Sequence, residues 1–193
     1  MRLLESARTD LERAYALLHG PRVYRMLNCA RSAGVQAVLV YRFGHWLHRQ
    51  GLATRIVLGP AYYVLSALVH ILWGIEIARE AQIGPGLYIG HFGGITVSPR
   101  VVIGRDCNLS QNVTIGMEGF GARSGAPVIG NCVYVGPGAR IFGNIRIGDN
   151  VKIGANAVVH TDLPSNAVVA LDPGFRIISL KGNRSERLAG HHD

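Results

Sequence analysis

Aliphatic side chains recur every six residues through the middle of the chain, between positions 77 and 159. An amphipathic helix repeats its apolar face about every 3.6 residues and a half-buried strand every two, so neither element produces this period. A six-residue period predicts a parallel β-helix, in which each repeat forms one short side of a coil. The series comprises Ile77, Ile83, Ile89, Ile95, Ile103, Leu109, Ile115, Ile129, Val135, Ile141, Ile147, Ile153 and Val159, with a slip between Ile95 and Ile103.

The series has one long interruption, at residues 116–128, which read GMEGFGARSGAPV. This glycine-rich stretch has no aliphatic residue at the expected position, which predicts a loop leaving the coil. Loops carried by a rigid scaffold commonly hold binding groups, although an insertion without a role is the alternative.

The residues before the repeats have a different pattern, with apolar positions at helical spacing. We expect helices over residues 1–18, 22–32 and 35–49, because Gly20-Pro21, Gly34 and Gly51 separate these stretches. The predicted organisation is therefore a helical region over 1–75, a β-helix over 76–163 and a closing strand and tail over 164–193.

The most apolar stretch of the chain is IVLGPAYYVLSALVHILWGI, at residues 56–75. Its length approaches that of a membrane span, but Gly59-Pro60 and His70 argue against a helix exposed to lipid on all sides. We expect a buried helix packed against the coil or a neighbouring subunit. The alternative hypothesis is peripheral contact with a membrane surface.

The 193-residue chain carries 20 Lys and Arg against 12 Asp and Glu, a net charge of +8. Such a balance is ordinary for a basic soluble protein and also favours polyanions such as CoA, anionic glycans or anionic lipid. No nucleic-acid-binding motif accompanies it, so no nucleic-acid partner is expected. The three cysteines lack metal-ligand spacing and the N-terminus lacks a secretory signal, which indicates a reduced, cytoplasmic protein.

Four stretches carry a family resemblance: GVQAVLVYRFGHWLHRQG (34–51), IEIAREAQIGPGLYIGHFGGITV (75–97), NVTIG (112–116) and IFGNIRIGDNVKIGANAVV (141–159). They resemble the hexapeptide-repeat acyltransferases, in particular the serine acetyltransferase branch and its subgroup from exopolysaccharide and colanic-acid gene clusters. The resemblance covers roughly residues 20 to 180. It implies a left-handed β-helix, acetyl-CoA as co-substrate and a homotrimer with active sites between subunits, and it leaves open whether trimers pair further.

The chemistry implied by this resemblance needs a base that accepts a hydroxyl proton. His91, in the segment YIGHFGG, matches the catalytic histidine of the family. An imidazole titrates near neutral pH and is suited to this role, whereas a lone histidine at a coil corner is more often an ordinary surface residue. Glu76 occupies the position of the acid that orients the histidine, where Asp is usual, and the alternative is a solvated surface carboxylate.

The resemblance also implies a groove between coils for acetyl-CoA, with small residues against the pantetheine arm and cations near its phosphates. No metal is needed for this reaction, and His45 and His48 alone are too few for a metal site. The expected cofactor-binding residues are Gly116, Gly136, Gly143, Gly154, Ala155, Arg176 and Lys181.

The acceptor is inferred from departures from the serine enzymes. Gly90 stands where they have Asp, residues 125–127 (Gly-Ala-Pro) stand in place of Arg-His-Pro, and His19 aligns with a further Asp. Because unpaired charge in a closed site is costly, the loss of these groups predicts a neutral acceptor, the hydroxyl of a sugar or polysaccharide precursor. The alternatives are O-acetylation of L-serine in cysteine biosynthesis and a catalytically inactive β-helix scaffold.

Overall fold

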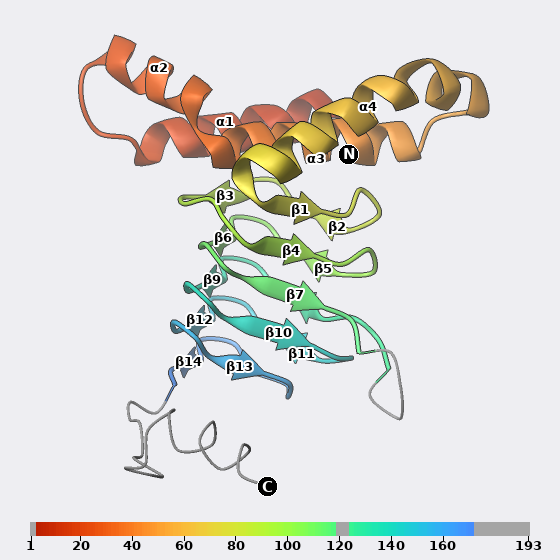
Figure 1. The fold of residues 1–193 in the computed structure, drawn as a ribbon. Coiled ribbons are helices and arrows are strands. Elements are labelled where there is room, and N and C mark those ends of the chain that lie inside the picture. The colour runs from red at the N-terminus through yellow and green to blue at the C-terminus, as the bar shows by residue number, and fades with distance from the viewer. Residues whose placement is uncertain (1–2, 119–123, 172–193) are drawn as a thin grey trace, which may run out of the picture.

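The computed structural model describes residues 3–118 and 124–171. Four helices come first: α1 (Leu3–Leu17), α2 (Arg22–Arg31), α3 (Ala33–His48) and α4 (Leu52–Trp73). The helices expected from the sequence are confirmed, and Figure 1 shows them gathered at one end of a solenoid of short strands.

All strand pairs of the described residues are parallel and build three sheets, one on each side of the solenoid (Figure 1). The sheets have the orders β1-β4-β7-β10-β13, β11-β8-β5-β2 and β14-β12-β9-β6-β3. This is the predicted left-handed parallel β-helix. Its strands are β1 (Ile75–Ile77), β2 (Gln82–Ile83), β3 (Tyr88–Ile89), β4 (Ile95–Val97), β5 (Val102–Ile103), β6 (Asn108–Leu109), β7 (Thr114–Gly116), β8 (Val128–Ile129), β9 (Tyr134–Val135), β10 (Arg140–Phe142), β11 (Arg146–Ile147), β12 (Lys152–Ile153), β13 (Val158–Val159) and β14 (Val168–Val169).

The strand register locates the slip in the six-residue series. Ile77 pairs with Val97, and Val97 pairs with Ile115, so Val97 rather than Ile95 holds the repeat position in β4. The period therefore runs without a break from Val97 to Ile115, and the extra residues of the first coil lie between Ile89 and Val97. The slip predicted from the spacing, after Ile95, is therefore one repeat too late.

The long interruption is the predicted loop between β7 and β8. Ile103 of β5 pairs directly with Ile129 of β8, although the loop lies between them in the chain. At the base of this loop, the backbones of Glu118 and Gly125 exchange two hydrogen bonds of 3.0 Å. The loop thus leaves the coil without disturbing the stacking of the strands on either side.

The aliphatic series forms the core of the solenoid. Val97, Ile115 and Ile141 are almost completely buried and stack on one another through their sheet. In β1 and β4 a second inward position is filled as well, because Ile75 and Ile95 are both buried and pair with each other. The end of the solenoid next to the helices therefore buries more aliphatic residues than the period alone predicts.

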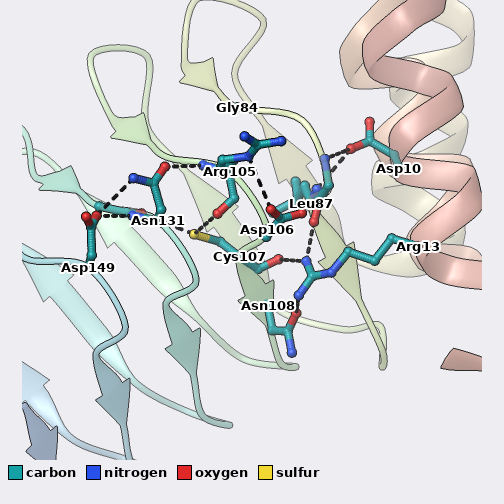
Figure 2. A network of polar contacts seen from close by, with 12 residues as sticks. Asp10, Arg13, Gly84, Leu87, Arg105, Asp106, Cys107, Asn108, Asn131 and Asp149 are labelled. Carbon is teal, nitrogen blue, oxygen red and sulfur yellow. Dashed lines mark hydrogen bonds and ion pairs between the residues drawn. The ribbon is translucent and has the colours of Figure 1, made fainter. Parts of the chain in front are cut away.

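A buried ion pair joins the helices to the first coil. Asp10 of α1 and Arg42 of α3 are each 4% exposed, and Arg42 Nε donates to Asp10 Oδ2 over 2.7 Å. Asp10 Oδ1 also accepts hydrogen bonds from the backbone N–H groups of Gly86 and Leu87 at 2.7 and 2.9 Å (Figure 2). Arg42 in turn donates to the carbonyl oxygens of residues 83 and 84. Both charges are thus paired with each other and with the connection between β2 and β3.

Arg13 extends this connection to the second coil. Its guanidinium donates to the carbonyl oxygens of Gly86 and Cys107 and to the side chain of Asn108 (Figure 2). Further along the solenoid, Asp149 accepts from Asn131, whose side chain accepts from the backbone N–H of residue 105. A ladder of side-chain hydrogen bonds therefore runs from α1 along this corner of the coils.

Helix α4 is not buried against the coil, which was one of the two packings expected from its sequence. Its buried residues are Gly59, Tyr62 and Val69, and most of its other apolar side chains are exposed. By length and composition, α4 is the one helix of the described residues that could cross a membrane. Packing against a neighbouring subunit stays a prediction.

Candidate functional site

His91 lies at the corner between β3 and β4, directly after Gly90, and is exposed. The extra residues of the first coil fall at this corner, so it is longer than the corners that follow it. The next residue, Phe92, packs edge-on against Trp73 at the end of α4, with ring centroids 5.2 Å apart. Gly93 and Gly94 have φ angles of 105° and 65°, which a residue with a Cβ rarely adopts. The histidine is therefore carried by an enlarged turn that is held from the side by an aromatic contact.

The corresponding corner of the next coil carries Gln111. Ile89 pairs with Leu109, so His91 and Gln111 each come two positions after a paired strand residue. Neighbouring strands are roughly 4.8 Å apart, which brings the two residues into the same small region. The Gln111 Oε1 atom is shielded from solvent and has no hydrogen-bond partner within the described part of the chain. The sequence alone does not indicate this residue, since only the strand register relates it to His91.

A cation lies at the backbone of Asn112, the residue after Gln111. Arg140 of β10 is exposed, and its Nη1 atom donates to the main-chain carbonyl of Asn112. The Asn112 backbone N–H donates to the carbonyl of Gly93 over 2.7 Å, which ties this corner to the turn that carries His91. The imidazole of His91, the amide oxygen of Gln111 and the guanidinium of Arg140 thus lie along the same corner of the solenoid, on successive coils.

Glu76, the predicted orienting acid, lies in the middle of β1 and is 64% exposed. Its Oε2 atom is 3.8 Å from Nδ1 of His70 in α4. No hydrogen bond or ion pair between Glu76 and His91 occurs over residues 3–118 and 124–171. The structure therefore brings Glu76 to a different histidine, and its role toward His91 stays a prediction.

The predicted cofactor-binding residues fall on two corners of the solenoid. Gly136, Gly154 and Ala155 follow β9 and β12, on the same corner as His91. Gly116 ends β7 and Gly143 follows β10, which places both at the next corner. All five stay predictions, and Arg176 and Lys181 lie outside the described residues.

Glycine at two of these positions also has a structural cause. A Cβ on Gly136 would lie 2.8 Å from the Ile153 carbonyl oxygen, and one on Gly154 would lie 3.0 Å from that of Val169. The neighbouring coil therefore requires small residues there, whether or not a ligand lies alongside. Gly116 differs, since the nearest atom to its Cβ would be 3.9 Å away.

The two histidines near the end of α3 have contacts of their own. His45 Nδ1 lies 2.9 Å from the Arg79 carbonyl oxygen, and His48 Nδ1 lies 3.9 Å from Glu80 Oε1. Across the described residues, no group of three or more His, Cys, Asp or Glu is arranged to hold a metal ion.

Comparison with known proteins identifies the repeats and the relatives. Residues 126–161 match the family described as bacterial transferase hexapeptide (six repeats). The chain is 40% identical to a serine acetyltransferase of Helicobacter pylori strain 26695 over 137 residues, which cover 69% of this chain and 75% of that protein. It is also 40% identical to a serine acetyltransferase of Synechococcus elongatus over 157 residues, of which it spans 61% of the length.

Solved structures agree with the sequence relatives. A serine acetyltransferase from Neisseria gonorrhoeae has a TM-score of 0.74 and 30% identity, covering 89% of this chain and 64% of that one. Serine acetyltransferase isoform 3 from Entamoeba histolytica, in complex with cysteine, has a TM-score of 0.73 and 27% identity. The match covers 92% of this chain and 61% of that one. The chain thus spans less than two thirds of the length of several of these relatives.

These findings correct the expected acceptor. Relatives at 35–40% identity are serine acetyltransferases, so the prediction of a sugar or polysaccharide acceptor is wrong, and the exopolysaccharide subgroup is not supported. The physical error was to treat charged side chains at a few aligned positions as the sole means of binding a zwitterion. Backbone groups, other cations and a neighbouring subunit can supply the same interactions. The chain belongs to the serine acetyltransferase family of hexapeptide-repeat transferases.

Proposed function

We propose that this protein transfers an acetyl group from acetyl-CoA to the hydroxyl of L-serine. The observation that carries the proposal is the 40% identity to the Helicobacter pylori serine acetyltransferase across 75% of that protein. The exposed imidazole of His91, at a corner of the coil, supports the proposal because it can act as the general base.

In the proposed mechanism, His91 accepts the proton of the serine hydroxyl as the oxygen attacks the thioester carbonyl. The C–S bond then breaks, and the imidazolium returns the proton to the departing CoA thiolate. A positioned general base contributes typically 10²- to 10⁴-fold to the rate, and alignment of the two substrates contributes further. Glu76 is proposed as a positioning residue, which requires its carboxylate to turn from His70 toward His91.

The zwitterionic acceptor needs partners for an ammonium and a carboxylate. We propose that the Gln111 side chain turns toward the acceptor, so that its Oε1 atom, which is shielded and has no partner among the described residues, accepts a hydrogen bond from the serine ammonium. Arg140 would pair with the serine carboxylate, because its guanidinium lies beside the carbonyl of the residue after Gln111. These two side chains would replace the charged groups that the chain lacks at the aligned positions.

A kinetic experiment tests this site. Arg140→Gln should raise the KM for L-serine roughly tenfold or more, with little effect on the KM for acetyl-CoA, since a charge-assisted contact is worth about 1.5–3 kcal/mol. Arg146→Gln is the matched control, because Arg146 is also exposed but lies on a different sheet. L-alanine, which lacks the hydroxyl, should give no CoA release. An unchanged KM for serine in Arg140→Gln would remove Arg140 from the site.

The assembly is a separate part of the proposal. We propose a homotrimer, in which residues from an adjoining subunit complete each site. Light scattering of the eluted protein should then give three times the chain mass of 20.8 kDa, or a multiple of that for paired trimers. A monomer with full activity would contradict it.

A further inference from the structure

The helical layer contacts the turn that carries His91 at the entry of that turn. Gly34, in the first turn of α3, lies against Ile89, the last residue of β3. A Cβ on Gly34 would lie 2.1 Å from the carbonyl oxygen of Ile89, so this close approach requires glycine. The strand that leads into the turn is therefore fixed by backbone packing two residues before His91.

The end of α4 contacts the same turn at its exit. The carbonyl oxygen of Gly74, the residue after α4, accepts a hydrogen bond from the Ile95 N–H over 3.0 Å. A Cβ on Gly74 would lie 3.2 Å from the nitrogen of Gly94 and 3.4 Å from the Cα of Gly93. Because Ile75 pairs with Ile95, α4 enters the solenoid next to the residues at which the turn ends (Figure 1).

Trp73, the last residue of α4, adds a third contact. Its indole ring packs edge-on against the ring of Phe92, and the centroid distance of 5.2 Å is typical of aromatic pairs. The indole N–H donates to Gln36 Oε1 of α3 over 3.1 Å, which sets the orientation of the ring. Trp73 is partly buried against the core of the solenoid, whereas Phe92 is 55% exposed. Trp73 is thus the fixed member of the pair.

We propose that Trp73 is a positioning residue, which holds the turn between β3 and β4 through Phe92 so that the His91 imidazole meets the acceptor hydroxyl in a productive orientation. The inference rests on the proposed function, since it concerns the base of that reaction. His91 is exposed, so its position depends on the backbone of the turn more than on packing of its own side chain. A misplacement of about 1 Å can cost roughly 10²-fold in rate. The alternative is that the aromatic pair only stabilises the fold.

Amide hydrogen exchange with mass spectrometry tests the hold on the turn without reference to the reaction. In Trp73→Leu, the peptide that covers residues 88–97 should exchange roughly tenfold faster or more than in the wild type. Trp73→Phe keeps a ring against Phe92 and should restore protection. Exchange of this peptide at the wild-type rate in Trp73→Leu would overturn the proposal.

Trp46→Leu is the matched control. Trp46 of α3 is also partly buried and also forms an aromatic pair, with Phe43 at a centroid distance of 6.1 Å. It lies twelve residues after Gly34 on the same helix, roughly 18 Å along the axis. Its loss should therefore leave the exchange of residues 88–97 unchanged, and equal acceleration in Trp46→Leu would overturn the assignment to Trp73.

Steady-state kinetics with L-serine test the consequence for the reaction. Trp73→Leu should lower kcat roughly 10- to 100-fold with little change in the KM for acetyl-CoA, and Trp73→Phe should restore most of the loss. Since the effect acts through Phe92, the double variant Trp73→Leu, Phe92→Leu should lose no more kcat than Trp73→Leu alone. A wild-type kcat in Trp73→Leu, or losses that simply multiply in the double variant, would overturn the proposal.

Two features keep the outcomes distinct. If circular dichroism shows that Trp73→Leu does not fold, Phe92→Leu takes its place, because that side chain is exposed, and it should show the same faster exchange and lower kcat. A wild type that releases no CoA with L-serine would refute the proposed function, and the exchange measurement would still decide whether Trp73 holds the turn. A lower kcat in Trp73→Leu with unchanged exchange would refute the positioning role alone.

Discussion

The substitution Asp10→Asn tests how the helical region is held to the solenoid. Asp10 accepts four hydrogen bonds, two from Arg42 and two from the backbone N–H groups of Gly86 and Leu87. Asparagine has nearly the same shape but no charge, and its NH₂ group would face donors. Arg42 would then remain buried without its counter-ion.

The magnitude follows from the burial of the pair. Removing one partner of a buried ion pair costs about 3–5 kcal/mol, compared with roughly 5–15 kcal/mol for the free energy of unfolding of a typical domain. With a urea dependence of about 2 kcal/mol per molar, the denaturation midpoint should fall by roughly 2 M. The comparison must be made at one protein concentration, because the stability of an oligomer depends on it.

The control uses a pair of the same helix that is open to solvent. Glu12 and Arg8 form an ion pair with side chains that are 62% and 80% exposed, so Glu12→Gln should leave the midpoint unchanged. The reasoning is refuted if Asp10→Asn unfolds at the same urea concentration as Glu12→Gln. That result would mean that water reaches Arg42, or that the helices are held mainly by apolar contacts.

Three further predictions concern single groups. Burial raises the pKa of Tyr41 to about 12, against the opposing effect of Arg42, whereas an unfolded tyrosine has a pKa of about 10. The folded state therefore loses stability as pH rises from about 10 toward 12, because the unfolded chain ionises first. The fall in the urea midpoint over this pH range should be smaller in Tyr41→Phe than in the wild type. Burial also raises the pKa of Cys107 to about 11, so at neutral pH iodoacetamide should modify the exposed Cys132 well before Cys107, as mass spectrometry of peptides can show. Glu76→Gln should lower kcat with little change in the KM for acetyl-CoA if Glu76 orients the catalytic base, and an unchanged kcat would leave it as a surface residue.

The architecture could be predicted because it is local and repetitive. Each coil uses the same inward aliphatic positions, and the break at residues 116–128 predicted the loop between β7 and β8. The slip was placed after Ile95, whereas the register puts the extra residues before Val97, at the corner that carries His91. Hydrophobic spacing alone does not distinguish Ile95 from Val97, because both side chains are buried on the same side of β4.

The remaining features depend on contacts that no spacing in the chain encodes. Asp10 and Arg42 belong to two different helices, so their pairing appears only when both pack on the coil. Gln111 is related to His91 across a coil that is longer than the regular ones, and the sequence period therefore does not align the two residues. The exposure of α4 was also beyond the sequence, because apolar composition is common to buried helices and to helices that await a partner.

The most direct test of the central claim is the rate of acetyl-CoA consumption with L-serine as acceptor, measured for the wild type and for His91→Asn. We expect serine-dependent CoA release by the wild type and a fall in kcat of roughly 10²- to 10⁴-fold in the variant, while acetyl-CoA still raises the melting temperature of both. Turnover of serine by His91→Asn at the wild-type rate, or a wild type that releases no CoA with serine, would contradict the account.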